Sequence, residues 1–550
     1  MADIQTTFSN SLTDAHRKIQ DQQFALTRQQ STIEKKDQKI QLLEELVNLL
    51  KAQRYHKRSE KFTDPNVKQE CFFTEAELND LNPIEEDEQQ EVIEVAAHEK
   101  QIRRGKRAKL PSYLPTVRIE HELTAEELKG PDGEVFEKIG EVITQQLDVI
   151  PASVQVIENV CFKYAVKDRE ELGVRQAKIK SQPIPKSIAS AGLLAQVAEA
   201  KFCHYLPLYR QEQIWASLDV HLPRNSLCRW MMKVGELVSP LVEYLMEEIK
   251  LHPHIQADET PVIVLENKEN KKTKKNKPPP DEFPDEKRHQ GYMWVYSNCN
   301  GVVYDYQDSR SGAHPFEMLS EFKGYLQTDA YSGYNAVLAL PDIQSVGCMA
   351  HARRKFTDIR KAAGKKKKLP VIDRVLNIIG KLYHIESQAR KNELSEKAIY
   401  QCRQEKALPI LKTLYDYLLE IKPKAPPTSL LGKAIAYSLN HWDALCRYTE
   451  QGYLSIDNNA AERQIKPFVM GRKNWLFHGN TKGAIAAANL YSLIQSAKLH
   501  NLKIFDYLKH VFEQIPSANT PRKLEKLLPQ YAKESVQMIK DLTSAKSTIG

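Results

Sequence analysis

The segment His254–Leu265, with the sequence HIQADETPVIVL, has the pattern of a β-strand that carries an acidic residue inside it. Its β-branched residues favour an extended, partly buried conformation. Asp258 is therefore expected to project from a sheet rather than from a loop. The segments that follow decide whether other charged groups lie beside it.

Four further segments complete a predicted sheet. Gly291 to Ser309 (GYMWVYSNCNGVVYDYQDS) contains two β-rich runs joined by Asn300-Gly301, which is a hairpin signal. HPFEMLSEF then predicts a helix, GYLQTDAYSGY a strand ending at Asp329, and QSVGCMAHARRKF a strand passing into a basic segment. This alternation predicts a mixed α/β sheet whose first and fourth strands can lie side by side.

Neighbouring first and fourth strands would bring Asp258 and Asp329 together. Two unpaired carboxylates at close range repel each other and are costly to bury. A divalent cation between them removes that cost, and hard oxygen ligands suit Mg²⁺ or Mn²⁺. A third carboxylate would complete a site for two ions, one activating the attacking oxygen and the other stabilising the leaving one.

Glu462 is the candidate for this third carboxylate. It lies in LSIDNNAAERQIKPFVMGRKNWLF, where a helix is expected to begin near Asp457 to Asn459, which are good capping residues. Asn458 and Asn459 are expected to support the carboxylate from the helix start. The alternative is an ordinary surface helix in which Glu462 pairs with Lys466 at i,i+4.

Cations and one aromatic ring near these acids are candidates for DNA contact. Arginine and lysine hold phosphates, and a tryptophan can stack on an unpaired base. Tyr209 to Val234 has the outline of a helix-turn-helix, although many helical hairpins share that outline. The residues expected to contact DNA are Arg224, Arg229, Arg353, Arg354, Lys355, Arg463, Lys466, Arg472, Lys473 and Trp475.

Cysteine usage indicates a reduced protein without a disulfide framework. The chain has 8 cysteines and no CxxC pair. Cys348 and His351 form a C-x-x-H on the last predicted strand, but a zinc site needs two more ligands and no residue is spaced to supply them. Zinc is therefore not expected, and His351 is interpreted as a structural side chain or a support for the carboxylates.

The N-terminal region has a heptad pattern. Apolar residues recur every seven positions at Leu12, Ile19, Leu26, Ile33, Ile40 and Val47. This pattern predicts a coiled coil that joins two or more subunits, with a single solvated helix as the alternative. Charged stretches then predict a linker, and Val117 to Lys167 predicts a small β-ribbon. Ala362 to Gly452 predicts a helical insertion.

Several of these segments resemble a known family. HIQADETPVIVL, GYLQTDAYSGYNAV, VGCMAHARRKF and SIDNNAAERQIKPFVMGRKNWLF resemble the catalytic domain of transposases from IS66-type bacterial insertion sequences. The resemblance implies an RNase H-like core in which Asp258, Asp329 and Glu462 match the family's DDE triad. Members commonly carry a cysteine-pair zinc module before this core, whereas the corresponding stretch here retains only Cys161.

The expected fold is an RNase H-like α/β core with a large helical insertion, preceded by a coiled-coil helix, a β-ribbon and a helical region. The expected domains are 1–62 (coiled-coil helix), 63–110 (charged linker), 111–170 (β-ribbon at the degenerate zinc-module position), 171–250 (helical DNA-binding region), 251–361 (first part of the core), 362–452 (helical insertion), 453–515 (glutamate helix of the core) and 516–550 (C-terminal helical tail).

The resemblance implies a transposase that cuts DNA ends and joins them to target DNA with two Mg²⁺ or Mn²⁺ ions. The alternatives are an RNase H-like nuclease that does not join, and an inactive transposase-derived repressor. The 79 basic and 71 acidic residues permit a DNA partner without demanding one. Small accessory proteins are often used by the family. Without a signal peptide or long apolar run, a cytoplasmic, nucleoid-associated protein with no membrane partner is expected.

Overall fold

The computed structural model describes residues 36, 39–40, 43–44 and 47, then 154–164, 175–176, 181–265, 288–363 and 368–533. The chain divides into two units, one formed by residues 1–85 and 180–550 and the other by residues 86–179. The first unit contains the predicted sheet and all of the acidic residues singled out above.

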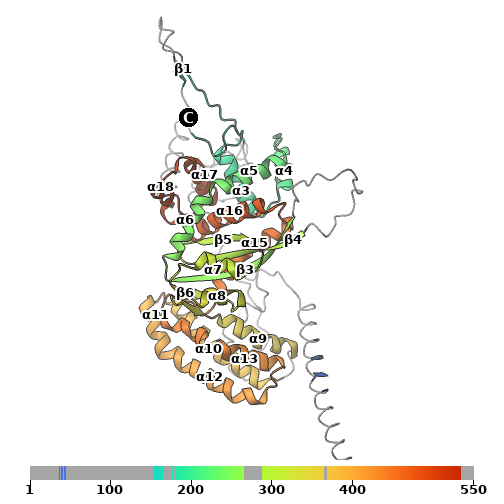
Figure 1. Ribbon diagram of the computed structural model, residues 1–550, viewed down its shortest axis with the longest axis vertical. Coiled ribbons are helices and arrows are strands. Elements are labelled where there is room, and N and C mark those ends of the chain that lie inside the picture. Colours follow the sequence, from blue (N-terminus) through green and yellow to red (C-terminus); the bar gives the residue numbers. More distant parts are fainter. Residues whose placement is uncertain are drawn as a thin grey trace, which may run out of the picture. The chain divides into compact units, whose positions relative to one another are not determined.

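A five-stranded mixed sheet is the centre of the first unit (Figure 1). Its order is β5-β4-β3-β6-β7. The strands are β3 (His254–Leu265), β4 (Arg288–Ser297), β5 (Val302–Gln307), β6 (Gly324–Gln327) and β7 (Ile343–Val346). β3 pairs antiparallel with β4 and parallel with β6, so the predicted α/β sheet with adjacent first and fourth strands is confirmed.

The hairpin between β4 and β5 forms where Asn300-Gly301 predicts it. Ser297 and Val302 are paired at its end, and the Asn298 amide donates to the Gly301 carbonyl at 3.0 Å. Two short helices, α7 (Ala313–Leu319) and α8 (Asn335–Leu338), connect the strands that follow. The hairpin leaves β5 at an edge of the sheet.

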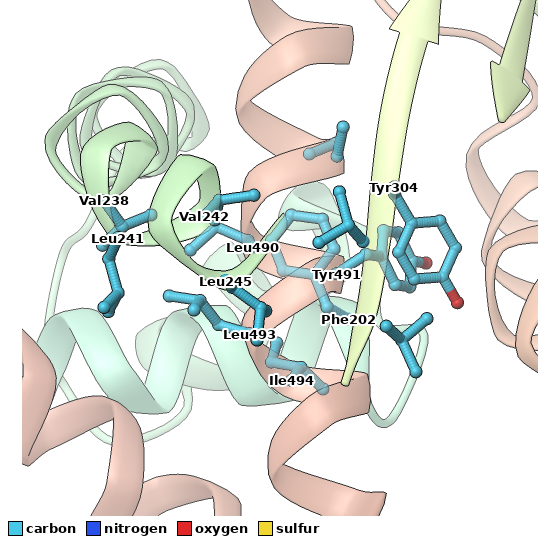
Figure 2. Close-up of a cluster of buried hydrophobic side chains, with 14 of the residues drawn as sticks. Phe202, Val238, Leu241, Val242, Leu245, Tyr304, Leu490, Tyr491, Leu493 and Ile494 are labelled. Carbon is cyan, nitrogen blue, oxygen red and sulfur yellow. The ribbon is translucent and has the colours of Figure 1, made fainter. Parts of the chain in front are cut away.

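Helix α16 (Thr481–Leu499) covers this edge strand. Ser492 and Ser496 each accept a hydrogen bond from a β5 amide, at Tyr304 and Val302, and both distances are 2.8 Å. Unpaired edge amides are a template for aggregation, and these serines satisfy two of them. Apolar side chains of α16 and of α6 (Ser239–Lys250) pack beside the strand in a shared core (Figure 2).

The helical region before the sheet contributes to the same core. It comprises α3 (Ala191–Phe202), α4 (Leu208–Ala216), α5 (Arg224–Leu237) and α6, while α17 (Ile504–Gln514) and α18 (Pro521–Glu525) follow α16. Gly235 on α5 lies so close to Ala486 on α16 that an added Cβ would meet its side chain and backbone. The absence of a side chain at Gly235 thus sets the close approach of these two helices.

The segment between the last strand and Glu462 is helical, as predicted. It contains α9 (Met349–Ala363), α10 (Pro370–Lys391), α11 (Glu396–Cys402), a π-helical turn (Arg403–Ala407), α12 (Leu408–Ile421), α13 (Leu430–Asn440) and α14 (Trp442–Cys446). These helices share a second apolar core. In Figure 1, helices α9 to α13 gather on the side of β6.

A buried ion pair ties this insertion to the residues that precede Glu462. Arg403 is 2% exposed and binds Glu386 with two nitrogens, at 2.9 and 2.7 Å. Its remaining hydrogen bonds go to the backbone carbonyls of Tyr448, Gln451 and Leu454. Arg403 therefore anchors the chain where it returns from the insertion to the sheet.

Only residues 154–164 of the predicted β-ribbon are among the described residues. In the unit of residues 86–179, only β1 (Lys163–Tyr164) and β2 (Arg175–Gln176) pair, antiparallel, among the described residues. Residues 154–162 have no regular structure, so the extended strand predicted from VQVIENVCFKYAV is wrong over most of its length. Apolar residues of this described segment are exposed, for example Val156 at 89%.

The N-terminal prediction is tested only at a few positions. The described residues between 36 and 47 are helical, and Ile40, Leu43 and Val47 are exposed in the single chain. The other heptad positions and the charged linker lie outside the described residues. Within the described part of the chain, no helix has both the length and the apolar character required to cross a bilayer.

Candidate active site

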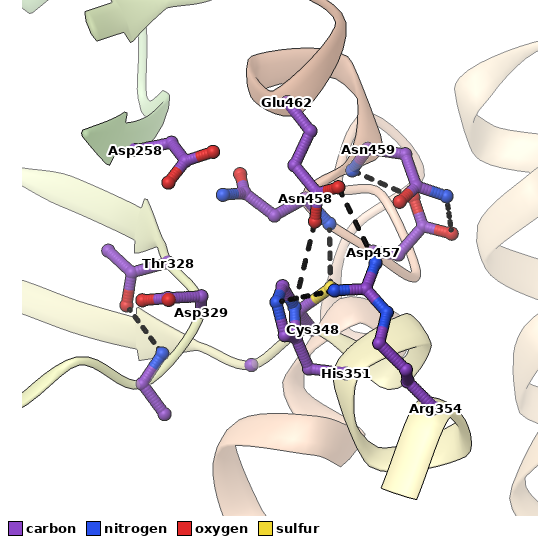
Figure 3. Close-up of polar contacts among 12 residues, drawn as sticks. Asp258, Thr328, Asp329, Cys348, His351, Arg354, Asp457, Asn458, Asn459 and Glu462 are labelled. Carbon is purple, nitrogen blue, oxygen red and sulfur yellow. Dashed lines mark hydrogen bonds and ion pairs between the residues drawn. The ribbon is translucent and has the colours of Figure 1, made fainter. Parts of the chain in front are cut away.

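The three predicted carboxylates come from three different elements of the sheet region (Figure 3). Asp258 lies within β3, and Asp329 follows β6 by two residues, so that the strand ends slightly earlier than predicted. Glu462 lies in the first turn of α15 (Asn459–Trp475), which begins where the cap residues predict it. The structure brings Asp258, Asp329 and Glu462 to one region.

Two buried glutamines hold the aspartate-bearing strands in register. Gln256 and Gln327 are directly paired positions of β3 and β6, and each lies two residues before an aspartate. Gln256 Nε2 donates to Gln327 Oε1 at 2.6 Å. Because side chains alternate across a strand, Gln256 and Asp258 project from the same face of the sheet. The glutamine pair thus lies beside the carboxylates.

The same glutamines hold the chain that leads into α15. Gln256 Nε2 donates to the Asp457 carbonyl at 3.1 Å, and Gln327 Nε2 donates to the Ser455 carbonyl at 2.8 Å. Asn458, fully buried, donates from Nδ2 to the Ala257 carbonyl at 2.9 Å. These bonds attach the start of α15 to β3. They explain how Glu462, although distant in sequence, reaches Asp258.

Asp457 caps α15 from just outside it. Its Oδ1 and Oδ2 accept hydrogen bonds from the backbone amide and the side-chain amide of Asn459, at 3.2 and 2.9 Å. Its Oδ2 also accepts from the Tyr383 hydroxyl of α10 at 2.9 Å. Asn459, which was predicted to support the Glu462 carboxylate, thus contacts Asp457. The insertion therefore contributes to the placement of the helix that carries Glu462.

Negative charge is concentrated around Asp258. Burial raises the pKa of Asp258 well above its usual value, and the neighbouring carboxylates of Glu259, Glu462 and Asp329 raise it further. Asp258 and Glu462 line a cavity of about 300 Å³ together with His351, Arg354, Ile465 and Lys466. A bound cation would relieve this repulsion.

Glu462 lies beside Arg354 and His351 in this conformation. Its Oε1 lies 3.7 Å from His351 Nδ1, and its Oε2 lies 3.6 Å from an Arg354 nitrogen. Burial lowers the pKa of His351 to about 4, with nearby Arg354 as the next cause. A neutral imidazole is thus placed beside Glu462, as the interpretation of His351 as a supporting side chain expects.

The C-x-x-H lies at a different place from the one predicted. Cys348 and His351 are not on the last strand, because β7 ends at Val346 and His351 is already in the first turn of α9. The buried Cys348 sulfur accepts a hydrogen bond from the Asn458 amide at 3.2 Å. Cys348, His351 and Glu462 have ligand atoms that all lie within 4.8 Å of one another, so a third ligand comes from far along the chain.

Sequence reasoning missed Glu259, the residue after Asp258. Its carboxylate accepts hydrogen bonds from Arg310 Nε at 2.8 Å and from the Tyr334 hydroxyl at 2.9 Å. Arg310 also lies over the Tyr331 ring, 3.7 Å from its centroid, and the Tyr331 amide donates to Asp329 Oδ1. Glu259 thus links β3 to the loop of Asp329. Two adjacent acidic residues, Asp258 and Glu259, within one predicted strand are the sequence feature that could have indicated a role for Glu259.

Several predicted DNA-contacting cations lie at the surface. Arg224, Arg229, Lys355, Arg463 and Lys473 are exposed. Arg224 and Arg229 lie on α5, whose buried face packs into the core, in the predicted helical hairpin with α4. Their contact with DNA remains a prediction.

Other predicted DNA contacts are engaged inside the protein. Arg353 is only 9% exposed, so its position does not support the predicted contact with DNA. Arg472 donates to the Pro261 carbonyl and to Thr260, which ties α15 to β3. The Trp475 ring packs edge-on against Phe202 and carries the Lys201 ammonium 4.1 Å from its centroid. The ring stabilises the α3–α15 contact, and base stacking by it stays a prediction.

The sequence profile of the Transposase IS66 family matches residues 186–277 and 281–486. The IS66 C-terminal element matches residues 492–530, and a profile described as Transposase C of IS166 homeodomain matches residues 42–119. The first profile alone covers more than half of the chain. The chain belongs to the IS66 transposase family. All three carboxylates lie inside the region that the first profile covers.

Relatives in Sinorhizobium fredii (strain NBRC 101917 / NGR234) are similar over most of this IS66-family chain. The uncharacterized protein y4jD is 32% identical over 429 residues, which is 76% of this chain and 81% of that protein. The uncharacterized protein y4qI is 29% identical over 407 residues, 71% of each chain.

Among solved structures, the Mos1 transposase paired-end complex with left transposon end matches 50% of this chain and 83% of that chain. It is 12% identical, with a TM-score of 0.13. A likeness this weak contributes nothing to the assignment.

Proposed function

We propose that this IS66-family transposase cleaves the ends of its element and joins the freed 3′-hydroxyls to target DNA at one site formed by Asp258, Asp329 and Glu462. The core that carries them would be RNase H-like, with the predicted domain boundaries. The observation that supports this proposal is the meeting of three carboxylates from β3, the end of β6 and the first turn of α15.

The donor set fits a hard divalent cation. Asp258, Asp329 and Glu462 offer carboxylate oxygens, which Mg²⁺ and Mn²⁺ prefer, and a bound cation would offset the burial and the neighbouring negative charge that raise the pKa of Asp258. We propose that these three residues hold two Mg²⁺ or Mn²⁺ ions. Bound ions would supply activation of the attacking oxygen and stabilisation of the leaving oxygen in each in-line displacement.

The chain's own residues perform the remaining work. The Gln256–Gln327 pair and Asn458 keep the strands and α15 at fixed distances, which orients the carboxylates before DNA arrives. Lys466 and Arg354 line the same cavity and would hold phosphate oxygens beside the carboxylates. Arg354 would then leave Glu462 for phosphate, which frees the carboxylate for its proposed role.

Surface cations would bind the DNA outside this cavity. Arg463 and Lys473 are exposed on α15, and Arg224 and Arg229 are exposed on α5. Affinity for DNA should fall steeply with salt because phosphate neutralisation dominates such binding. We further propose that the N-terminal heptads pair two subunits, so that the two ends of the insertion sequence are held together.

A strand-transfer assay with pre-cleaved ends and a target plasmid tests the proposal. We expect joining that requires Mg²⁺ or Mn²⁺ and is abolished in Asp258→Asn, Asp329→Asn and Glu462→Gln, with end binding largely kept in a gel-shift assay. Hydrolysis without joining would favour the nuclease, and end binding without either reaction would favour the repressor. Full activity in any one variant would remove that residue from the site.

A further inference from the structure

A second set of potential metal ligands shares Glu462 with the proposed catalytic site. Cys348 immediately precedes α9, His351 lies in the first turn of that helix, and Glu462 lies in the first turn of α15. One sulfur, one nitrogen and one oxygen from these residues lie within 4.8 Å of one another. We refer to this set as the Cys348 site.

We propose that the Cys348 site binds Zn²⁺ and that the bound ion inhibits the transposase by keeping Glu462 away from Asp258 and Asp329. The binding itself follows from the arrangement of the ligands alone. The inhibition rests on the proposed function, because it requires Glu462 to act in catalysis.

The ligand chemistry selects a borderline-soft cation. A cysteine sulfur with a histidine nitrogen and a carboxylate oxygen suits Zn²⁺, whereas Mg²⁺ and Mn²⁺ favour oxygen ligands. Zinc sites with three protein ligands complete a tetrahedron with water. The cavity that His351 and Glu462 line provides room for that water and a route for the ion.

The distances require only small side-chain movements. With zinc–ligand bonds of about 2.0–2.3 Å, ligand atoms of one tetrahedral ion stand roughly 3.3–3.7 Å apart. His351 Nδ1 and Glu462 Oε1 already lie 3.7 Å apart. His351 faces Arg354 with its other nitrogen, Nε2, at 3.4 Å, so Nδ1 is the nitrogen turned toward the site.

Burial and the neighbouring carboxylates of Asp457 and Glu462 raise the pKa of the Cys348 thiol, so the bound ion itself must displace the thiol proton, while a backbone hydrogen bond orients the sulfur. The Asn458 amide donates to Cys348 Sγ at 3.2 Å, and this outer hydrogen bond orients the sulfur. Cys348 also lies at the N-terminal end of α9, where the helix dipole favours negative charge. On binding, the thiol proton passes to solvent.

Arg354 contacts the other carboxylate oxygen of Glu462, Oε2. Its side chain is 36% exposed, and a cation bound beside Glu462 would replace it by repelling the guanidinium toward solvent. The carboxylate of Glu462 therefore has three alternative partners: Arg354, the proposed Mg²⁺ ions and Zn²⁺. Competition among them gives the mechanism of inhibition.

Binding is tested on metal-free, DNA-free protein with Co²⁺ as a spectroscopic probe and with Zn²⁺ as its competitor. We expect a thiolate-to-cobalt charge-transfer band that Zn²⁺ abolishes. Cys348→Ser should remove this band, and His351→Gln should weaken zinc affinity by more than the roughly 100-fold that loss of an outer-shell partner costs. Cys402→Ser on α11 is the matched control and should keep the band, as should Asp258→Asn.

Inhibition is tested by adding Zn²⁺ to the Mg²⁺-supported strand-transfer reaction, with each variant compared with its own zinc-free rate. We expect at least tenfold inhibition of the wild type and of Cys402→Ser, and none in Cys348→Ser. The proposed site would be overturned if the wild type showed no thiolate–cobalt band, or if Cys348→Ser and His351→Gln bound zinc as tightly as the wild type does. Cysteine-dependent zinc binding in a protein without strand transfer would support the site and contradict the proposed function.

Discussion

Gln256 and Gln327 face each other across two parallel strands, and each precedes an aspartate by two residues. Their side chains are 4% and 0% exposed and are joined by a 2.6 Å hydrogen bond. Buried amides of this kind are stabilising only when all their groups are satisfied. Here each glutamine also donates to a carbonyl of the segment before α15, so one polar pair connects β3, β6 and the helix that carries Glu462.

We predict that Gln327→Met lowers the strand-transfer rate and the stability together. The substitution conserves volume but leaves the carbonyls of Gly347 and Ser455 without their donor. An unsatisfied buried group costs about 1–3 kcal/mol, so the unfolding free energy should fall by at least that amount. Chemical denaturation and strand-transfer rates at saturating DNA measure the two effects.

The control is Gln344→Met on the neighbouring strand β7, where the side chain is exposed. Gln344→Met should change neither the unfolding free energy nor the strand-transfer rate. A Gln327→Met protein with the wild-type rate would show that the glutamine pair does not position the carboxylates.

We predict that Asp258→Asn stabilises the metal-free protein at neutral pH. Because burial and neighbouring carboxylates raise the pKa of Asp258 in the folded state, ionisation of this group opposes folding. The contribution of the Asp258 carboxyl group to folding stability is fully present below its unfolded-state pKa of about 3.9. It is lost as the pH rises through its folded-state pKa. The Tm of Asp258→Asn should therefore exceed that of the wild type at neutral pH, with a gap that closes near pH 4.

Magnesium should reverse this difference. An ion that binds only the folded state raises the Tm by mass action, and the wild type should gain more than the asparagine variant. Thermal unfolding between about pH 4 and 8, with and without Mg²⁺, measures both effects. A lower Tm for Asp258→Asn at neutral pH without metal would contradict the raised pKa.

We predict that Arg403→Met destabilises the protein by roughly 3–5 kcal/mol, because it leaves the buried Glu386 carboxylate without its partner. The segment of residues 448–454 also loses its anchor, so catalysis should decline even where the protein stays folded. Lys412→Met is the control, since Lys412 pairs with Asp416 at an exposed site where such pairs contribute about 1 kcal/mol or less. Equal effects in the two variants would refute the anchoring role.

We predict opposite effects from two glycine-to-alanine changes. At Gly235 a Cβ would meet Ala486, so Gly235→Ala should separate α5 from α16 and cost roughly 1–3 kcal/mol. At Gly380, within α10, a Cβ would meet nothing within 4 Å, so Gly380→Ala should stabilise by roughly 0.5–1 kcal/mol. Urea denaturation of both variants measures the difference, and stabilisation by Gly235→Ala would contradict the close packing.

The strand and the helix that carry Asp258 and Glu462 were predictable because the local sequence pattern of each matches its place in the fold. β3 has the predicted bounds, His254–Leu265, since its β-branched residues lie in the middle of a sheet. α15 begins after Asp457 and Asn458, as the cap residues predict, and continues through Pro467. Neighbouring placement of β3 and β6 followed from the order of strands and helices along the chain.

The partners of long charged side chains were not predictable from one sequence. Arg353 and Arg472 have the same local signature as exposed cations, and only the packing of α9 and α15 turns them inward. The link from Cys348 and His351 to Glu462 spans the whole insertion, so no local spacing reveals it.

The position of α16 has a consequence for the order in which the protein is made. Ribosomes release the N-terminal part of a chain first, so β5 emerges long before the serines of α16 that satisfy its edge amides. During that interval the nascent chain carries both aspartates but neither Glu462 nor a covered sheet edge. Premature termination within the insertion should thus yield an aggregation-prone fragment that lacks Glu462, and the proposed activity would require nearly complete translation.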